Sequence, residues 1–255
     1  MLSHTAQVLT ARRALAFEQG NPLVLDNLAS HFVTAEYMNI ARRSDDAVHY
    51  VLMRHRVLED YYVERAKTHR QAVILGSGFD TKFQRHAGLW QRHLEVDTHE
   101  MVAHKRDVLT RHHLSVPDFI TPEGEAIEQF KQILLATDPS LPTLFLGEGY
   151  FMYFSLDHFK GFFDMAFNYY HTQPSFGFDM ISDTYPQNPA NRAVLERIRA
   201  AGEKVMTWCG PEVIKKYFLE KGIDVDVWFP SRLQGHYLKT KWNKEDDKYV
   251  VLAGR

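Results

Sequence analysis

Two glycines and a distant carboxylate have the spacing that points most directly to chemistry. The apolar run Val73–Leu75 ends at Gly76-Ser77-Gly78, and Asp97 ends the next apolar run. Glycines at a strand-to-helix turn let the backbone approach a ligand closely. A carboxylate at this spacing accepts hydrogen bonds from both hydroxyls of a ribose. The combination predicts a nucleoside-containing cofactor, whereas the glycines alone are equally typical of a tight turn that binds nothing.

Thr81 narrows the kind of cofactor. It stands where the fingerprint of dinucleotide-binding proteins has its third glycine. That glycine allows close packing near a pyrophosphate, so Thr81 favours an adenosine-type cofactor without a pyrophosphate. A nucleotide-dependent oxidoreductase is the alternative, because it shares the strand, the glycine turn and the distant acid.

A second acidic residue, Glu148, lies between two glycines directly after the apolar run Thr143–Leu146. Open α/β sheets bind ligands at the carboxyl ends of their strands, and burial of a carboxylate there is costly unless it has partners. Glu148 is therefore a candidate binding residue. The alternative is a structural carboxylate that caps the next helix.

An aromatic cluster follows Glu148. Most of its rings are expected in the core, because aromatic side chains supply the largest buried areas. Tyr150 and Tyr153 are the best candidates to line a substrate pocket, since each carries a hydroxyl close in sequence to Glu148. We take Tyr153 as the candidate catalytic residue.

Histidine and cysteine spacing gives no sign of a metal or disulfide site. His99 and His104 are five positions apart, which places them about 140° apart on a helix, so they do not converge on one metal ion. Cys209 is the only cysteine, which excludes an internal disulfide and is typical of a reducing compartment. We expect no metal cofactor.

The composition limits which partners and which cellular compartment we expect. The 255 residues include 30 lysines and arginines against 32 aspartates and glutamates, so no strong field attracts nucleic acid or an anionic membrane. The most apolar stretch, Leu141–Phe154, is shorter than the ~20 residues that span a bilayer. The amino-terminal residues lack the continuous apolar core of a signal peptide. We therefore expect a cytoplasmic protein with a small-molecule partner.

The elements that must position these residues alternate between strand and helix. Short apolar runs typical of buried parallel strands cover residues 72–75, 93–96, 143–146 and 175–180. Helical patterns lie between or after them, at residues 99–109, 126–135 and 156–169. This alternation predicts an α/β fold with an open, mostly parallel, doubly wound sheet.

The whole chain, residues 1–255, is expected to form one domain. Residues 1–70 show mainly helical spacing and form an amino-terminal extension, while residues 71–255 form the α/β core. Near the end, residues 225–229 and 249–253 are expected to form an antiparallel hairpin.

Five motifs, in this order, resemble the leucine carboxyl methyltransferase-like family, whose members use S-adenosylmethionine and include bacterial polyketide O-methyltransferases. The motifs are Thr5-Ala6 with Arg13-Ala14, Arg54-His-Arg56 with Asp60, Leu75-Gly-Ser-Gly-Phe-Asp-Thr81 with Arg85, Glu95-Val-Asp97 with Lys105, and Pro142-Thr-Leu-Phe-Leu-Gly-Glu148-Gly with Tyr153. The resemblance implies a Rossmann-like class I methyltransferase that methylates a carboxylate or hydroxyl oxygen of a small molecule. Some members instead methylate the terminal carboxylate of a protein.

The resemblance also implies roles for single residues. Arg54 would pair with the carboxylate of the cofactor's methionine, and Gly76-Ser77-Gly78 would pass beneath it. Asp97 would hold the ribose, and Glu148 would lie near the amino group.

Some positions depart from the family pattern. Asp118-Phe119 is matched to an acidic-apolar pair that contacts adenine, although the usual pair ends in leucine. Lys82 replaces the usual arginine after Asp80-Thr81. Lys82, together with a carboxyl-terminal part that is short for the family, leaves a catalytically silent cofactor-binding or interaction protein as the alternative from another class.

Overall fold

A seven-stranded sheet runs through the centre of the computed structural model, which describes residues 3–43, 48–200, 202–240 and 246–254. The strand order is β3-β2-β1-β4-β5-β7-β6, and β1 to β5 are parallel to one another. The strands are β1 (Gln71–Leu75), β2 (Arg92–Val96), β3 (Asp118–Ile120), β4 (Thr143–Gly147), β5 (Ser175–Ile181), β6 (Val225–Trp228) and β7 (Lys248–Ala253). This open, mostly parallel sheet confirms the predicted fold class.

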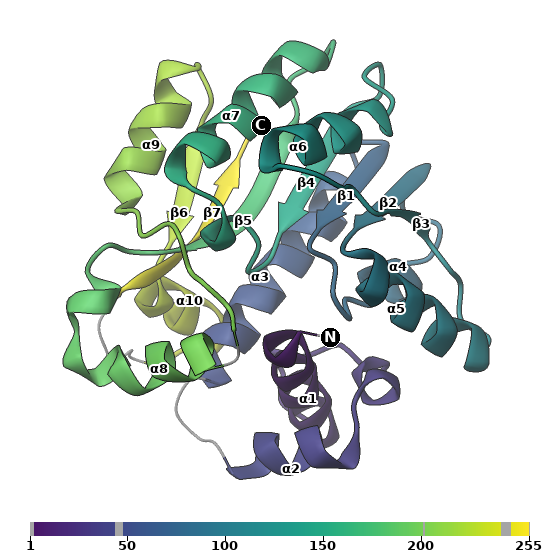
Figure 1. Cartoon of the computed structure of the whole chain (residues 1–255), viewed down its shortest axis with the longest axis vertical. Coiled ribbons are helices and arrows are strands. Elements are labelled where there is room, and N and C mark those ends of the chain that lie inside the picture. The colour runs from purple at the N-terminus through teal and green to yellow at the C-terminus, as the bar shows by residue number, and fades with distance from the viewer. Residues whose placement is uncertain (1–2, 44–47, 201, 241–245, 255) are drawn as a thin grey trace.

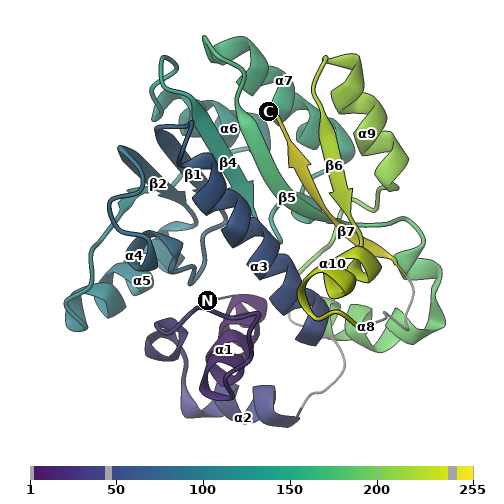
Figure 2. The same cartoon turned by 180° about the vertical axis from the view of Figure 1, so that it is seen from behind.

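Helices cover both faces of the sheet. They are α1 (His4–Glu18), α2 (Ala35–Arg43), α3 (Val48–Arg65), α4 (Lys82–Arg85), α5 (His99–Arg111), α6 (Ala126–Leu135), α7 (Leu156–Tyr169), α8 (Arg192–Ala200), α9 (Pro211–Glu220) and α10 (Pro230–Tyr237). Figure 1 shows α6, α7 and α9 on one face, and Figure 2 shows α3 and α10 on the other. Short 3-10 turns are η1 (Ala29–Phe32), η2 (Phe151–Tyr153), η3 (Tyr185–Gln187) and η4 (Pro189–Asn191).

The two helical layers explain why the central strands are apolar throughout. All five residues of β1 are buried, because a strand covered on both faces has no solvent side. Val73 and Leu75 join the core beneath α6, α7 and α9, whereas Ala72 and Ile74 pack with residues of α3. The first of these cores holds most of the aromatic cluster that follows Glu148, as predicted, including Phe151, Phe159, Phe162 and Phe163.

Helices α1, α2 and α8 gather at the carboxyl edge of the sheet (Figure 1). The helical character predicted for residues 1–70 is confirmed by α1, α2 and α3 within the described residues. None of the helices in the described part of the chain combines the length and the apolarity that crossing a membrane requires.

Two features of the fold differ from the simple sequence pattern. β6 and β7 pair antiparallel, as predicted, but α10 lies between them in the chain, so they are not joined by a tight turn. β3 was not predicted, because it has only three residues and its first side chain, Asp118, is exposed.

Candidate functional site

A cavity of about 640 Å³ lies at the carboxyl edge of the sheet. It adjoins the point where the strand order reverses: β2 and β3 lie on one side of β1, and β4 lies on the other side. Such topological switch points are where open α/β sheets bind ligands, and the volume is typical of small-molecule sites. Seven residues singled out from the sequence line the cavity: Arg54, Gly76, Gly78, Asp97, Glu148, Tyr150 and Tyr153.

The glycine turn and Asp97 are bonded to each other. Gly76 and Gly78 have φ angles of 61° and 46°, in the region that glycine adopts without steric cost. The Gly78 N–H donates to Asp97 Oδ2 over 2.7 Å, and the Thr98 N–H donates to Oδ1 over 2.7 Å. Burial raises the pKa of Asp97, although these two N–H groups partly offset the effect. The turn after β1 is therefore fixed to the end of β2.

Gly76 is also confined by the ring of Tyr150, which yields a first prediction. A Cβ atom at Gly76 would lie 2.7 Å from Tyr150 Cδ2, so Gly76→Ala combines a collision with a strained φ. We expect a loss of roughly 2–4 kcal/mol in the free energy of unfolding, measured with urea. Gly20→Ala is the matched control, because Gly20 has a φ of 67° but no atom within 4 Å of its Cβ position. Equal losses in both variants would contradict the role given to Tyr150.

Arg54, on α3, is held by two carboxylates, of which Asp179 is buried and Glu148 partly buried. Its Nε and Nη2 donate to Glu148 Oε1 over 3.2 and 3.0 Å, and its Nη1 donates to Asp179 Oδ2 over 2.7 Å. The other oxygen of Asp179 accepts from the Gly149 N–H over 2.6 Å. Arg54 is 5% exposed, so these bonds fix the guanidinium in one orientation at the cavity wall.

Asp179 was not identified from the sequence. It lies in β5, whose alternating Phe176, Phe178 and Met180 dominate the pattern and mark the strand as core. The signal was present, because a carboxylate in a fully buried strand demands a partner. Burial raises the pKa of Asp179, and the charge of Arg54 offsets this only in part.

Glu148 is surrounded by basic side chains. Its Oε2 lies 2.9 Å from His55 Nδ1 and 3.7 Å from Lys82 Nζ, while Lys82 also pairs with Asp80. Burial opposes ionisation of Glu148, but His55 and Arg54 outweigh it and hold its pKa well below the usual range. Glu148 is therefore ionised, and the unusual Lys82 is one of its partners.

Three of these groups are close enough to bind a metal ion. His55, Asp80 and Glu148 bring ligand atoms within 4.8 Å of one another. The ammonium group of Lys82 already lies against both carboxylates. Lys82 thus supplies the positive charge that a metal ion would otherwise bring to this cluster.

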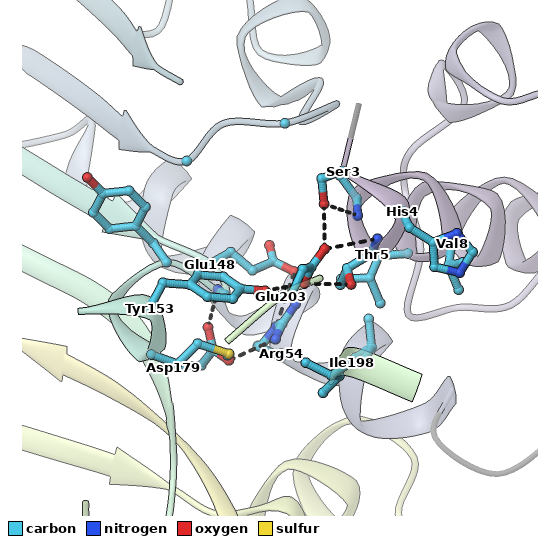
Figure 3. A pocket seen from close by; sticks show the side chains of 18 of the residues that line it. Ser3, His4, Thr5, Val8, Arg54, Glu148, Tyr153, Asp179, Ile198 and Glu203 are labelled. Atoms are coloured by element: carbon cyan, nitrogen blue, oxygen red, sulfur yellow. Dashed lines mark hydrogen bonds and ion pairs between the residues drawn. The ribbon is translucent and has the colours of Figure 1, made fainter. Parts of the chain in front are cut away.

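Tyr153, on η2, meets a residue that sequence reasoning missed. Its hydroxyl donates to Glu203 Oε2 over 2.7 Å, and Glu203 also accepts hydrogen bonds from Ser3 and Thr5 at the start of α1 (Figure 3). Burial raises the pKa of Tyr153, and the negative charge of Glu203 adds to the effect. Glu203 follows α8, far in sequence from every motif, and no local pattern distinguishes it.

Three predicted cofactor residues do not line the cavity. Ser77 is buried between the two lining glycines, and its N–H donates to the carbonyl of Val96. Asp118 is exposed on β3. Phe119 packs against the cluster around Phe79. A role for Asp118-Phe119 in contacting adenine stays a prediction.

Comparison with known proteins shows the family and the fold. Residues 6–166, more than half of the chain, match the sequence model described as leucine carboxyl methyltransferase. No curated protein matches the chain in sequence.

Solved structures share the fold at low sequence identity. A candidate methyltransferase from Thermobifida fusca aligns with a TM-score of 0.65 at 15% identity, covering 100% of this chain and 95% of its own. A DUF574 family protein from Streptomyces avermitilis gives 0.63 at 12% identity, with coverages of 100% and 98%. An S-adenosylmethionine-dependent methyltransferase from Clostridium acetobutylicum gives 0.52 at 12% identity, with coverages of 86% and 96%.

Proposed function

The chain belongs to the leucine carboxyl methyltransferase family, and we propose that this S-adenosylmethionine-dependent methyltransferase methylates a carboxylate or hydroxyl oxygen of a small molecule. The observation that carries the proposal is the convergence of Arg54, Asp97 and Glu148 on one cavity beside the glycine turn. These residues come from α3 and from the ends of β2 and β4; Arg54 and Glu148 pair with each other, and Asp97 reaches the same cavity from a different strand.

The groups that line the cavity fit the polar parts of S-adenosylmethionine. A guanidinium has five N–H groups, and three of them suffice for the bonds from Arg54 to Glu148 and Asp179. The other two would hold the cofactor's carboxylate, while the ionised Glu148 would attract its ammonium group. Asp97 would accept hydrogen bonds from the ribose hydroxyls. When bound, the cofactor supplies an electrophilic methyl group.

The remaining walls would serve to position the acceptor. Apolar side chains from α1, α8 and β5 face the cavity, including Val8, Ile181, Val194 and Ile198. They exclude water and hold the acceptor oxygen in line with the methyl group. Alignment of two reactants in this way is worth ~7–11 kcal/mol of the barrier.

Ligand-induced thermal stabilisation tests the cofactor. S-adenosylmethionine and its demethylated product should each raise Tm, because a ligand at about 100 times its Kd adds ~2.7 kcal/mol to the free energy of unfolding. NAD at the same concentration should leave Tm unchanged. Stabilisation by NAD alone would instead favour a nucleotide-dependent oxidoreductase.

Transfer of a tritiated methyl group to a panel of carboxylic acids and phenols tests the reaction. Labelled methyl ester or methyl ether is the expected product. Cofactor binding without transfer to any panel member or to a peptide carboxyl terminus would favour the catalytically silent alternative.

A further inference from the structure

The carboxylate of Glu203 is saturated with hydrogen-bond donors at one end of the cavity. Its Oε1 accepts from Ser3 Oγ over 3.0 Å and from the Thr5 N–H over 3.4 Å. Its Oε2 accepts from Thr5 Oγ1 over 2.8 Å and from the Tyr153 hydroxyl over 2.7 Å (Figure 3). A carboxylate only accepts hydrogen bonds, so it can serve all four of these donors at once.

This arrangement decides what Tyr153 can offer to a molecule in the cavity. A tyrosine hydroxyl has one proton and two lone pairs. The proton is directed at Glu203, so the tyrosine oxygen can only accept a hydrogen bond from a molecule in the cavity. An acceptor that brings its own O–H proton can donate to this oxygen, whereas a carboxylate meets two groups that repel it.

We propose that Tyr153 and Glu203 together select a neutral hydroxyl, such as a phenol, as the methyl acceptor and disfavour a carboxylate. The inference rests on the proposed function and names the acceptor class for that same cavity. Tyr153 Oη would contact the acceptor directly, and Glu203 would be the residue that orients the tyrosine hydroxyl.

The other charges at the cavity wall are placed differently. Arg54 is neutralised by Glu148 and Asp179. Lys248 lies 4.6 Å from the ring centre of Tyr185 and also lines the cavity, as does Arg12 on α1. A carboxylate acceptor would have to use Lys248 or Arg12, away from the bond between Tyr153 and Glu203.

The same pair accounts for the proton that a hydroxyl acceptor must lose. The acceptor oxygen forms a bond to the methyl carbon as the bond from that carbon to sulfur breaks, and the cofactor becomes a neutral thioether. The acceptor's proton passes to Tyr153 Oη while the tyrosine proton moves to Glu203. Glu203 then releases its proton to water, and all atoms and charges balance.

Two probes with the same ring system test the acceptor class. At neutral pH 2-naphthol is uncharged and 2-naphthoate is ionised. We would measure their Kd values by calorimetry with S-adenosylhomocysteine bound, and then their methylation with S-adenosylmethionine. The wild-type protein should bind 2-naphthol at least about tenfold more tightly than 2-naphthoate, because 2-naphthol gains one hydrogen bond and avoids one repulsion.

Variants separate this role from a structural one. Glu203→Gln frees the tyrosine proton, so the preference for 2-naphthol should fall to less than about threefold, within the worth of a weak hydrogen bond. Tyr153→Phe leaves the contacts of Glu203 with α1 in place and should also weaken 2-naphthol binding about tenfold. Glu196→Gln is the control, because Glu196 is exposed on α8 and outside the cavity lining, and it should keep the wild-type preference.

Affinity for S-adenosylhomocysteine distinguishes the possible failures. If the wild-type protein binds it but binds the two probes equally, or prefers 2-naphthoate, the acceptor assignment is overturned. The same holds if Glu203→Gln and Tyr153→Phe both bind the cofactor product and keep the full preference. If the wild-type protein does not bind S-adenosylhomocysteine, the proposed function itself fails.

Discussion

Arg54→Ala should destabilise the protein by about 3–5 kcal/mol and abolish methyl transfer, because it leaves the buried Asp179 and the partly buried Glu148 without their shared counter-charge. Glu148 and Asp179 each accept hydrogen bonds from this guanidinium, and Arg54 is itself only 5% exposed. Urea unfolding measures the loss. Since small proteins are stable by roughly 5–15 kcal/mol, the variant should still fold in the absence of denaturant.

The loss in Arg54→Ala should depend on pH. Without Arg54, burial raises the folded pKa of Asp179 further, while Glu148 loses one of the charges that lower its pKa but keeps His55 and Lys82. A carboxyl group with a raised folded pKa binds more protons in the folded than in the unfolded protein, so stability falls as pH rises through that window. The deficit relative to the wild type should therefore shrink as the pH is lowered from neutral towards about 5.

In the wild-type protein, the contribution of Glu148 to stability depends on pH in the opposite direction. There the folded pKa lies well below the ordinary value of 4.5, so the ionised group stabilises the fold above that value and the contribution is lost as the pH falls through the folded pKa. Arg56→Ala is the control, because Arg56 forms a partly exposed pair with Asp60 on α3 and should cost no more than ~1 kcal/mol. Similar losses for Arg54→Ala and Arg56→Ala would refute the buried cluster.

Asp97→Ala should weaken binding of S-adenosylhomocysteine by roughly 10- to 100-fold, the worth of hydrogen bonds to a charged group. The variant removes the acceptor for the ribose hydroxyls and also releases the Gly78 N–H. Because burial raises the pKa of Asp97, the ionised side chain costs the free protein some stability. The variant should therefore stay folded, so that calorimetry reports binding alone.

Asp107→Ala provides the comparison for Asp97. Asp107 is exposed on α5 and pairs with Arg111 one turn away, so its loss should leave the affinity unchanged. Asp97→Asn keeps an oxygen for the Gly78 N–H and should lie between the wild type and Asp97→Ala. If Asp97→Ala binds S-adenosylhomocysteine with unchanged affinity, this carboxylate does not bind the ribose.

The part of the site that lies at strand ends could be predicted from the sequence. Gly76, Asp97 and Glu148 follow apolar runs, and the carboxyl ends of parallel strands share one edge of a sheet. Their placement therefore follows once the strands are recognised. Arg54 was found only through the family resemblance, because a basic residue on an amphipathic helix is ordinarily exposed.

The missed residues depend on tertiary packing. Asp179 lies within a strand whose apolar neighbours indicate core, and only the position of α3 shows that Arg54 compensates its charge. Glu203 reaches Tyr153 because α8 and the start of α1 meet at the same edge of the sheet (Figure 1). No local pattern reports such a meeting of distant segments. β3 escaped prediction because three residues are too few for a periodic signal.

Helix α3 has two duties along its length. Leu52, Val57 and Leu58 pack on the sheet, and Arg54 on the same helix forms part of the cavity wall. Local unfolding of α3 would expose the core and also disrupt the ligand site. A ligand bound to Arg54 should therefore make this local unfolding less favourable. Amide hydrogen exchange should then slow over α3 when the site is filled, and slow least in exposed loops remote from it. A bound ligand should therefore also slow proteolysis of the protein.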